Sequence, residues 1–333
     1  MSEQKKSASE LRFDLVSKDW VVIATGRARR PEDFAGQKRE KIEVETKDCP
    51  FCNLSSQEKP TLEYKNSAGE AEVTVVPNKY PAFAHSDSLG ERAEGPYSLM
   101  DGVGFHEVVI TKDHKKTLAQ MSPQEVRRVI DAYQERYLDL ANEEFVNYVS
   151  IFHNNGHEAG ASIAHPHSQI IAIPLIDPDL QGGINGSRQF FENQGECVHC
   201  KMLEWDLKDR RRIVFENKDF VVLCPFASHV AFELSIYPKE HHPYFERIKD
   251  AEKDSLAVAL QVALEKLYKG LNDPAYNFFL HTAPADGKDY GHYHWHFEIL
   301  PKTSTWAGFE LGTGIEISTV EPEAAAEYLR KIE

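Results

Sequence analysis

The chain has 333 residues, of which 41% are hydrophobic, and its formal net charge is −15 at pH 7. This length is enough for one large or two ordinary domains with a sizeable core. The acidic balance argues against nucleic acid as a partner, because phosphate contacts need a basic face, and no apolar run approaches the length of a membrane span.

The N-terminal segment, MSEQKKSASE, is polar and lacks the apolar stretch of a signal peptide, so we expect a cytoplasmic location. One dense basic cluster follows in GRARRP, with Arg27, Arg29 and Arg30. A local cluster of this kind can hold a small anionic substrate on an otherwise acidic protein.

Four of the five cysteines form two C-x-x-C pairs, CPFC (Cys49, Cys52) and CVHC (Cys197, Cys200), and Cys224 is left over. Such a pair is either a redox pair or half of a metal site. A redox pair normally opens a helix in a thioredoxin-like unit, and we expect neither pair to have that setting. Since the chain also has 15 histidines, the pairs favour metal.

Further along the chain, the charged stretch from His85 to Gly95 is typical of a mobile surface loop. A helix should begin after Ser122, because SPQE forms a capping box, and should run to about Glu144. The apolar run IIAI before Pro174 predicts a buried strand.

Three more segments complete the expected order. The Gly- and Asn-rich stretch 179–196 reads as a linker, residues 251–271 as a second long helix, and EPEAAAEYLRKIE as a C-terminal helix.

The two halves of the chain repeat one order of features. Each has a C-x-x-C pair, a strand, a strand with a histidine just past its end, a long helix, another strand, a loop and a strand carrying H-x-H. We therefore predict an α+β fold of two repeats, each with four or five strands and one long helix. Residues 1–178 form the first repeat, 179–196 the linker and 197–333 the second repeat.

The repeat converts scattered histidines into two ligand sets of two thiolates and two imidazoles, which suit a closed tetrahedral zinc site. We predict two structural zinc ions per chain. The alternative is that the histidines are ordinary strand-end residues. In the second set, His242 competes with His241, and His292 with His294. The predicted sets are Cys49, Cys52, His114 and His165, and Cys197, Cys200, His241 and His294.

His167 remains free in AHPHSQ, and side-chain alternation places it on the same strand face as His165 and Gln169. The upstream loop HNNGHEAGAS offers backbone N–H groups and hydroxyls to a phosphate. A neutral imidazole is a good nucleophile at physiological pH, so His167 could attack the α-phosphorus of a nucleoside diphosphate sugar. The alternative is a buried, hydrogen-bonded histidine. The second half has HYHWHFEI and no Gly-rich loop, and we interpret it as a degenerate copy.

These motifs resemble the galactose-1-phosphate uridylyltransferases of the histidine-triad superfamily. The resemblance covers nearly the whole chain, through FDLVSKDWVVIATGRARRP, CPFC, KDHKKTL, FHNNGHEAGASIAHPHSQI, HTAP, HWHFE and GFELGTG. It implies two histidine-triad-like repeats, each a mostly antiparallel half-barrel sheet with a long helix, and a homodimer. The second C-x-x-C pair places the chain in the branch with two Cys-Cys-His-His zinc sites.

The resemblance also implies roles. His167 would be the catalytic nucleophile, and Gln169 would hydrogen-bond the phosphoryl group. Phe309 and Glu310 would contact the hexose, in that family from the other subunit. The remaining substrate-binding positions would be Arg27, Arg30, Asn78, Asn154, Gly160 and Ser162.

The activity implied is exchange of UMP between UDP-glucose and galactose 1-phosphate, by ping-pong transfer through a covalent uridylyl-histidine. Two alternatives stay open. One is an ADP-glucose phosphorylase or a dinucleoside polyphosphate phosphorylase, for which Lys79 and Ser168 are weak indications. The other is a non-enzymatic zinc- or nucleotide-binding protein, which an intact His167 and Gln169 disfavour.

Overall fold

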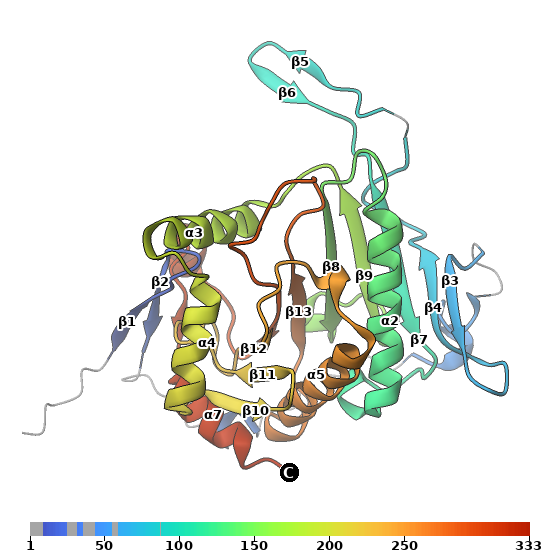
Figure 1. Ribbon diagram of the computed structural model, residues 1–333. Coiled ribbons are helices and arrows are strands. Elements are labelled where there is room, and N and C mark those ends of the chain that lie inside the picture. Colours follow the sequence, from blue (N-terminus) through green and yellow to red (C-terminus); the bar gives the residue numbers. More distant parts are fainter. Residues whose placement is uncertain (1–8, 25–31, 36–43, 55–58, 87) are drawn as a thin grey trace, which may run out of the picture.

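One antiparallel sheet of ten strands forms the centre of the molecule (Figure 1). The computed structural model describes residues 9–24, 32–35, 44–54, 59–86 and 88–333. The strands of the central sheet are β3 (Leu62–Lys65), β4 (Ala71–Pro77), β7 (Phe105–Thr111), β8 (Tyr148–Asn155), β9 (His167–Ile173), β10 (Ile213–Glu216), β11 (Phe220–Leu223), β12 (Leu234–Pro238), β13 (Tyr276–His281) and β14 (His296–Pro301).

The strand order confirms the predicted repeat and the α+β class. The first half contributes β3-β4-β7-β9-β8 and the second β10-β11-β12-β14-β13, so equivalent strands occupy equivalent places. The halves meet where β8 pairs with β13, with Phe152 opposite Phe279. The two repeats therefore form one continuous sheet, and residues of β13 lie directly beside the first half.

Two long helices, α2 (Pro123–Leu140) and α5 (Asp250–Gly270), cover one face of this sheet (Figure 1). The predicted capping box is confirmed, since the Ser122 hydroxyl accepts from the Glu125 N–H and the Glu125 carboxylate accepts from the Ser122 N–H. The helix ends at Leu140, before the predicted Glu144, and a turn follows. Apolar side chains of both helices lie in the main core, and Arg127 of α2 pairs with Asp250 of α5 at 3.0 Å.

The predicted linker is wrong in one respect, because most of it is the helix α3 (Pro178–Gln194). Asp177 caps this helix with its carboxylate, which accepts from the Leu180 N–H at 2.8 Å. The glycines of α3 do not make the segment a flexible linker; they let the helix pack closely against the N-terminal segment. A Cβ on Gly186 would lie 1.9 Å from the backbone oxygen of Val16, so only glycine lets α3 approach the N-terminal segment.

The remaining elements lie around the sheet. The predicted C-terminal helix is confirmed as α7, and β1, β2 and β15 form a separate small sheet. The helical elements are α1 (Glu32–Ala35), α4 (Val198–Asp209), α6 (Gly308–Thr313), α7 (Pro322–Arg330), η2 (Thr46–Asp48), η4 (Leu118–Gln120), η5 (His157–Ala159) and η6 (Phe245–Arg247), and the three strands are β1 (Glu10–Phe13), β2 (Trp20–Ile23) and β15 (Ile317–Ser318).

The stretch predicted as a surface loop ends in a two-stranded hairpin of β5 (Arg92–Glu94) and β6 (Tyr97–Leu99), which projects from the body of the molecule (Figure 1). All three residues of β5 are exposed, and Tyr97 is 72% exposed. The prediction of a surface segment is therefore confirmed for the described residues, although the segment has regular structure.

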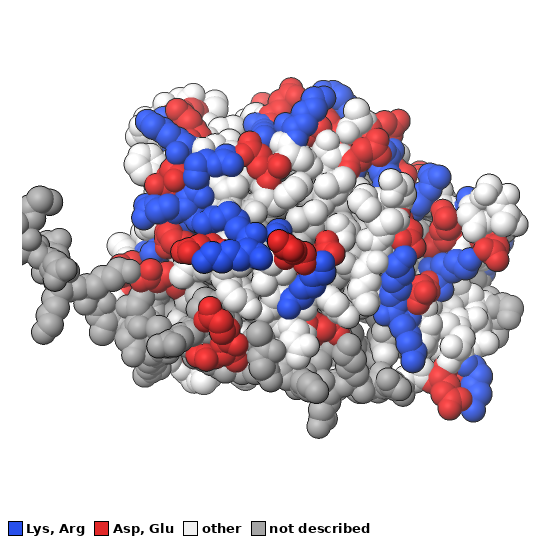
Figure 2. All heavy atoms as spheres, turned by 90° about the horizontal axis from the view of Figure 1, so that it is seen from below, with Lys and Arg blue, Asp and Glu red and all other residues white. Residues whose placement is uncertain are grey.

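The surface of the molecule carries charges of both signs. On the face seen from below, acidic and basic side chains lie next to one another (Figure 2). Surface side chains also form ion pairs within helices and elsewhere in the structure, as Lys331 and Glu327 of the C-terminal segment do at 2.7 Å. In the described part of the chain, every helix is too short or too polar to cross a bilayer.

Candidate active site

The face of the first half opposite α2 and α5 carries the predicted catalytic residues. Along β9, Ile170 and Ala172 are fully buried in the helix-covered core, so alternation turns His167 and Gln169 to the other face. The ring of Phe51 contacts both His165 and His167, with ring centres 5.9 and 4.9 Å apart. The predicted metal ligand and the predicted nucleophile therefore share one neighbourhood.

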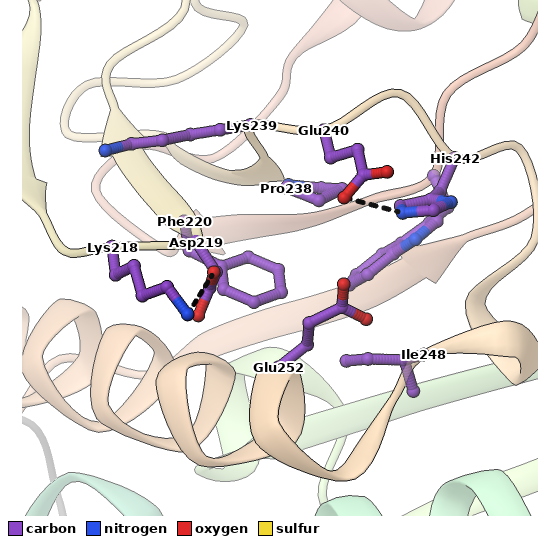
Figure 3. A pocket seen from close by; sticks show the side chains of 10 residues that line it. Lys218, Asp219, Phe220, Pro238, Lys239, Glu240, His242, Ile248 and Glu252 are labelled. Atoms are coloured by element: carbon purple, nitrogen blue, oxygen red, sulfur yellow. Dashed lines mark ion pairs between the residues drawn. The ribbon is translucent and has the colours of Figure 1, made fainter.

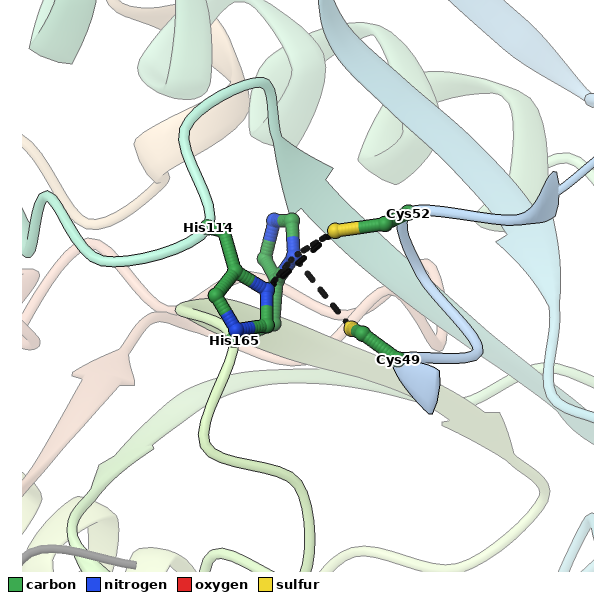
Figure 4. Close-up of side chains that lie close together, drawn as sticks. All are labelled: Cys49, Cys52, His114 and His165. Carbon is green, nitrogen blue, oxygen red and sulfur yellow. Dashed lines mark hydrogen bonds between the residues drawn. The ribbon is translucent and has the colours of Figure 1, made fainter. Parts of the chain in front are cut away.

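The first Cys-His group is brought together as predicted (Figure 4). Cys52 Sγ lies 3.2 Å from His114 Nδ1 and 3.4 Å from His165 Nδ1, and Cys49 Sγ lies 3.6 Å from His165 Nδ1. Tetrahedral zinc with bonds of ~2.0 Å to nitrogen and ~2.3 Å to sulfur spaces such ligands by roughly 3.3–3.7 Å. The group thus has the dimensions of a tetrahedral metal site.

The histidine tautomers also fit a metal ion. His114 Nε2 lies 2.7 Å from the Val44 carbonyl, and His165 Nε2 lies 2.7 Å from the Thr111 carbonyl, so both Nε2–H groups donate. Each Nδ1 then carries a lone pair, and the two Nδ1 atoms face each other at 3.4 Å. Two facing lone pairs are stabilised by a cation between them, and such carbonyl partners are the usual support of metal-bound histidine.

The second Cys-His group repeats this geometry and answers the open ligand question. Its members are Cys197, Cys200, His241 and His294, not His242 or His292. Cys200 Sγ lies 3.3 Å from His241 Nδ1 and 3.5 Å from His294 Nδ1. As in the first group, both Nε2 atoms face carbonyls, those of Gly291 at 2.9 Å and Pro238 at 3.0 Å. Both groups could hold a metal ion.

One expectation about the cysteines is wrong. Cys197 is the N-cap of α4, so this pair does open a helix. The two histidine nitrogens beside it still favour metal over a redox pair. In the first group, burial and the neighbouring Cys49 raise the pKa of Cys52 to about 11, so two thiolates there need a cation.

His167 is held in one tautomer beside the first group. Its Nδ1–H donates to the His165 carbonyl at 2.9 Å, which leaves the lone pair on Nε2. No described residue hydrogen bonds to Nε2. The side chain is 7% exposed, and burial lowers the pKa of His167, so the ring is neutral at pH 7. A neutral imidazole with a free Nε2 is able to act as a nucleophile.

Gln169 is oriented by His106, a residue that the sequence reasoning missed. The Ala82 N–H donates to His106 Nδ1 at 3.3 Å, which places the ring proton on Nε2, 2.8 Å from Gln169 Oε1. Asn78, a predicted nucleoside-binding residue, has its amide nitrogen 3.0 Å from the same Nε2, but only the oxygen of Gln169 can accept the proton. With its oxygen engaged, Gln169 has its NH₂ group left to donate. A lone histidine in the apolar strand FHEVVIT was the available signal.

The Gly-rich loop after β8 is braced from the second half. Asn277 of β13 donates to Asn154 Oδ1 at 2.7 Å and to the Ala159 carbonyl at 2.8 Å. The oxygen of Asn154 accepts this bond, and none of the described residues accepts from its NH₂ group, which could donate to a substrate. Gly160 has φ +88°, which disfavours other residues, and a Cβ there would lie 3.9 Å from the Asn154 amide nitrogen. Ser162 is exposed on the same loop. The sequence reasoning missed Asn277.

Ser168 does not face this site. Its hydroxyl lies on the helix-covered side, in hydrogen-bonding contact with Tyr133 and 2.9 Å from His153 Nδ1. The serine therefore satisfies polar groups beneath the strand, and a direct contact with a nucleotide base is not its role in this geometry.

The other predicted substrate-binding residues have no described contact with His167 or fall outside the described residues. Arg27 and Arg30 fall outside the described residues. Phe309, in α6, is 49% exposed, and Glu310 accepts from the Ala307 N–H at 3.1 Å. No described contact joins these two residues to His167 within the chain.

The second half keeps part of this arrangement. His296 Nδ1 lies 3.0 Å from the His294 carbonyl, as His167 does from His165. Glu298 takes the place of Gln169, opposite the equivalent phenylalanine of the neighbouring strand. His199 and Tyr237 pack on the His296 ring at 5.2 and 4.7 Å. A carboxylate repels a phosphoryl group and the packed rings fill the space, which agrees with a degenerate copy.

Comparison with known proteins agrees with this geometry. The family model "Galactose-1-phosphate uridyl transferase, N-terminal domain" matches residues 1–176, and "Domain of unknown function (DUF4921)" matches residues 98–331. The ADP-glucose phosphorylase of Arabidopsis thaliana is 33% identical, over 98% of this chain and 94% of its own. The galactose-1-phosphate uridylyltransferase of Thermotoga maritima is 30% identical, over 97% and 98%.

A solved structure supports the same assignment. The structure of an ADP-glucose phosphorylase from Arabidopsis thaliana with bound ADP-glucose superimposes with a TM-score of 0.82 and 31% identity, over 98% of this chain and 99% of that one. The chain therefore belongs to the galactose-1-phosphate uridylyltransferase family of nucleotidyltransferases.

Proposed function

We propose that this protein transfers a nucleotidyl group from a nucleoside diphosphate sugar to a second phosphate-bearing anion, by double displacement through His167. The observation that carries the proposal is the state of that residue. Its Nδ1–H is bonded to the His165 carbonyl at 2.9 Å, its ring is neutral, and no described residue hydrogen bonds to its Nε2. Those are the properties required of a nucleophilic histidine.

In the first step, Nε2 of His167 attacks the α-phosphorus. The N–P bond forms as the bond from phosphorus to the bridging oxygen breaks, and the sugar phosphate leaves with that electron pair. In the second step, an oxygen of the acceptor anion attacks the same phosphorus and His167 leaves as neutral imidazole. The NH₂ groups of Gln169 and Asn154 donate to the phosphoryl oxygens in both steps.

Zinc is the metal that we propose for both Cys-His groups, because two thiolates and two imidazoles are its usual structural ligands. Four protein ligands leave no open position, so zinc would supply rigidity and not chemistry when bound. In the first half it would fix His165, whose carbonyl anchors His167.

An ADP-sugar is the donor that the comparisons favour, with inorganic phosphate as the acceptor. The ADP-glucose phosphorylase of Arabidopsis thaliana is the more similar of the two relatives by identity, 33% against 30%, and its structure with ADP-glucose covers nearly the whole chain. UDP-glucose with galactose 1-phosphate is the second candidate, supported by the Thermotoga maritima uridylyltransferase and by the family model over residues 1–176.

A homodimer would complete the site. Three apolar side chains of the α6 segment are exposed to solvent, and residues of this segment contact the hexose from the other subunit in the family that the motifs resemble. The exposed fractions are 45% for Trp306, 49% for Phe309 and 73% for Leu311. Burial of this segment against a partner would place Glu310 near the sugar.

The test is a panel of ADP-glucose and UDP-glucose, each with phosphate and with galactose 1-phosphate as acceptor, assayed with the wild-type and His167→Ala proteins. We expect parallel reciprocal plots for one donor, and protein labelled by nucleotide-labelled donor only when His167 is present. Intersecting plots together with unlabelled wild-type protein would exclude the double displacement, and turnover by His167→Ala would exclude the nucleophile.

A further inference from the structure

A cavity of about 360 Å³ lies in the second half of the molecule, beside the second Cys-His group (Figure 3). Its walls come from the turn before β11, the end of β12 and the following loop, the start of α5, and Trp295, and two lysines, Lys218 and Lys239, lie in this lining. His242 in that loop directly follows His241 of the Cys-His group, but its own ring faces this cavity and not that group.

Three side chains in the cavity form a set of possible metal ligands. One atom each from Glu240, His242 and Glu252 lies within 4.8 Å of the other two. His242 Nε2 is 3.7 Å from Glu240 Oε2, within the range of neighbouring ligands on one ion. Figure 3 shows both glutamate carboxylates turned toward the histidine ring, one from the loop and one from α5.

One nitrogen of this set lacks a hydrogen-bond partner within the described chain. His242 Nε2 is buried and forms no hydrogen bond. Trp295, which is 1% exposed, also lines the cavity. Glu252 uses one oxygen to accept from the Lys249 N–H at 2.8 Å, and its other oxygen has only a long contact to the Lys249 ammonium, at 3.4 Å. A buried nitrogen of this kind calls for a partner, such as a water or an ion.

The first half contains an equivalent cavity with a different charge partner for its glutamate. A cavity lies at the equivalent place there, and Glu125 is the counterpart of Glu252. In the first half, the Lys116 ammonium lies 2.7 Å from the Glu125 carboxylate. Pro243 stands at the position of Lys116 in the second half, and His242 at that of Lys115. Glu125 therefore has a close lysine partner, whereas Glu252 has only the Lys249 ammonium at 3.4 Å and faces an imidazole.

We propose that the cavity of the second half binds a divalent metal ion through His242, Glu240 and Glu252. One imidazole and two carboxylates are suitable ligands for Mn²⁺ or a similar ion. The two Cys-His groups, with their thiolates, suit zinc instead. Water would fill the remaining positions. The ion would tie the loop that carries His241 to the start of α5.

Binding of Mn²⁺ to the nucleotide-free protein, measured by the electron paramagnetic resonance signal of free Mn²⁺, tests the proposal. We expect one bound ion per chain with a Kd on the order of 10⁻⁴ M, as in weaker carboxylate sites. Glu240→Gln and His242→Ala should each weaken binding at least about tenfold, since even an outer partner of a metal has an effect of that size.

Two controls keep the result unambiguous. Glu240 is exposed over 70% of its side chain, so Glu240→Gln leaves the core untouched. Glu125→Gln changes the equivalent glutamate of the first half and should leave Mn²⁺ binding as in the wild type. Mn²⁺ should also raise the melting temperature of the wild type but not of Glu240→Gln. Absence of Mn²⁺ binding, equal binding by wild type and Glu240→Gln, or an equal loss in Glu125→Gln would each overturn the proposal.

Discussion

His106→Ala removes the side chain that holds the oxygen of Gln169, and its effect on transfer tests whether Gln169 acts as an oriented donor. The contact is 2.8 Å long and leaves the NH₂ group of Gln169 to donate. Without the imidazole, the amide can turn, and its oxygen can face the phosphoryl group as well as its nitrogen. We therefore expect slower transfer with substrate binding little changed.

The expected size follows from the kind of bond removed. Loss of one neutral hydrogen bond costs about 0.5–1.5 kcal/mol, which is roughly a two- to thirteenfold fall in rate. Loss of the donor itself, in Gln169→Ala, should cost about 2.7–4 kcal/mol by analogy with one oxyanion-hole donor. In the Gln169→Ala background no amide remains to be oriented, so adding His106→Ala should change the rate little.

The assay is a double-mutant cycle on the rate of nucleotidyl-enzyme formation, measured by rapid quench with labelled donor. Any general loss from removing the imidazole appears in both backgrounds and cancels in the coupling energy. Metal content and melting temperature of the four proteins serve as folding controls. Additive losses, with no coupling between the two positions, would refute the positioning role of His106.

Four further predictions rest on other residues. His167→Ala should lower transfer by several orders of magnitude while both metals stay bound, as elemental analysis would show. Cys52→Ser should release one of the two metals and lower the melting temperature, whereas equal metal content in the variant would contradict a four-ligand site. Gly186→Ala should destabilise the protein, because its Cβ would lie 1.9 Å from a backbone oxygen, and an unchanged urea midpoint would show that α3 does not pack as described. Burial alone would lower the pKa of His229, but Glu233, 3.4 Å away, and Glu298 raise this pKa to about 10. The ion pair of His229 therefore contributes fully to stability below about pH 6.5, and its contribution is lost as pH rises through about 10. The melting-temperature difference between wild type and His229→Gln should accordingly shrink from pH 6 toward pH 10, and a constant difference would count against the ion pair.

The repeat, the two Cys-His groups and the strand face that His167 shares with Gln169 could be predicted from sequence because each depends on local pattern. A capping box, an H-x-H strand and a C-x-x-C pair each fix the relative positions of residues that are close in the chain. The same order of features occurring twice then predicted which residues far apart in the chain lie together, such as Cys49 and His165.

Only the tertiary structure decided which residues meet across the sheet. His106 reaches Gln169 because β7 lies beside β9, and Asn277 braces the Gly-rich loop because β13 of the second half lies beside β8. Neither pairing leaves a local signal. The same holds for α3, where glycines that suggest a flexible linker are required by close contact with a segment far away in the chain. A high glycine content shows only that the backbone can adopt many conformations. Whether the glycines give a flexible linker or a closely packed helix depends on the tertiary contacts around them.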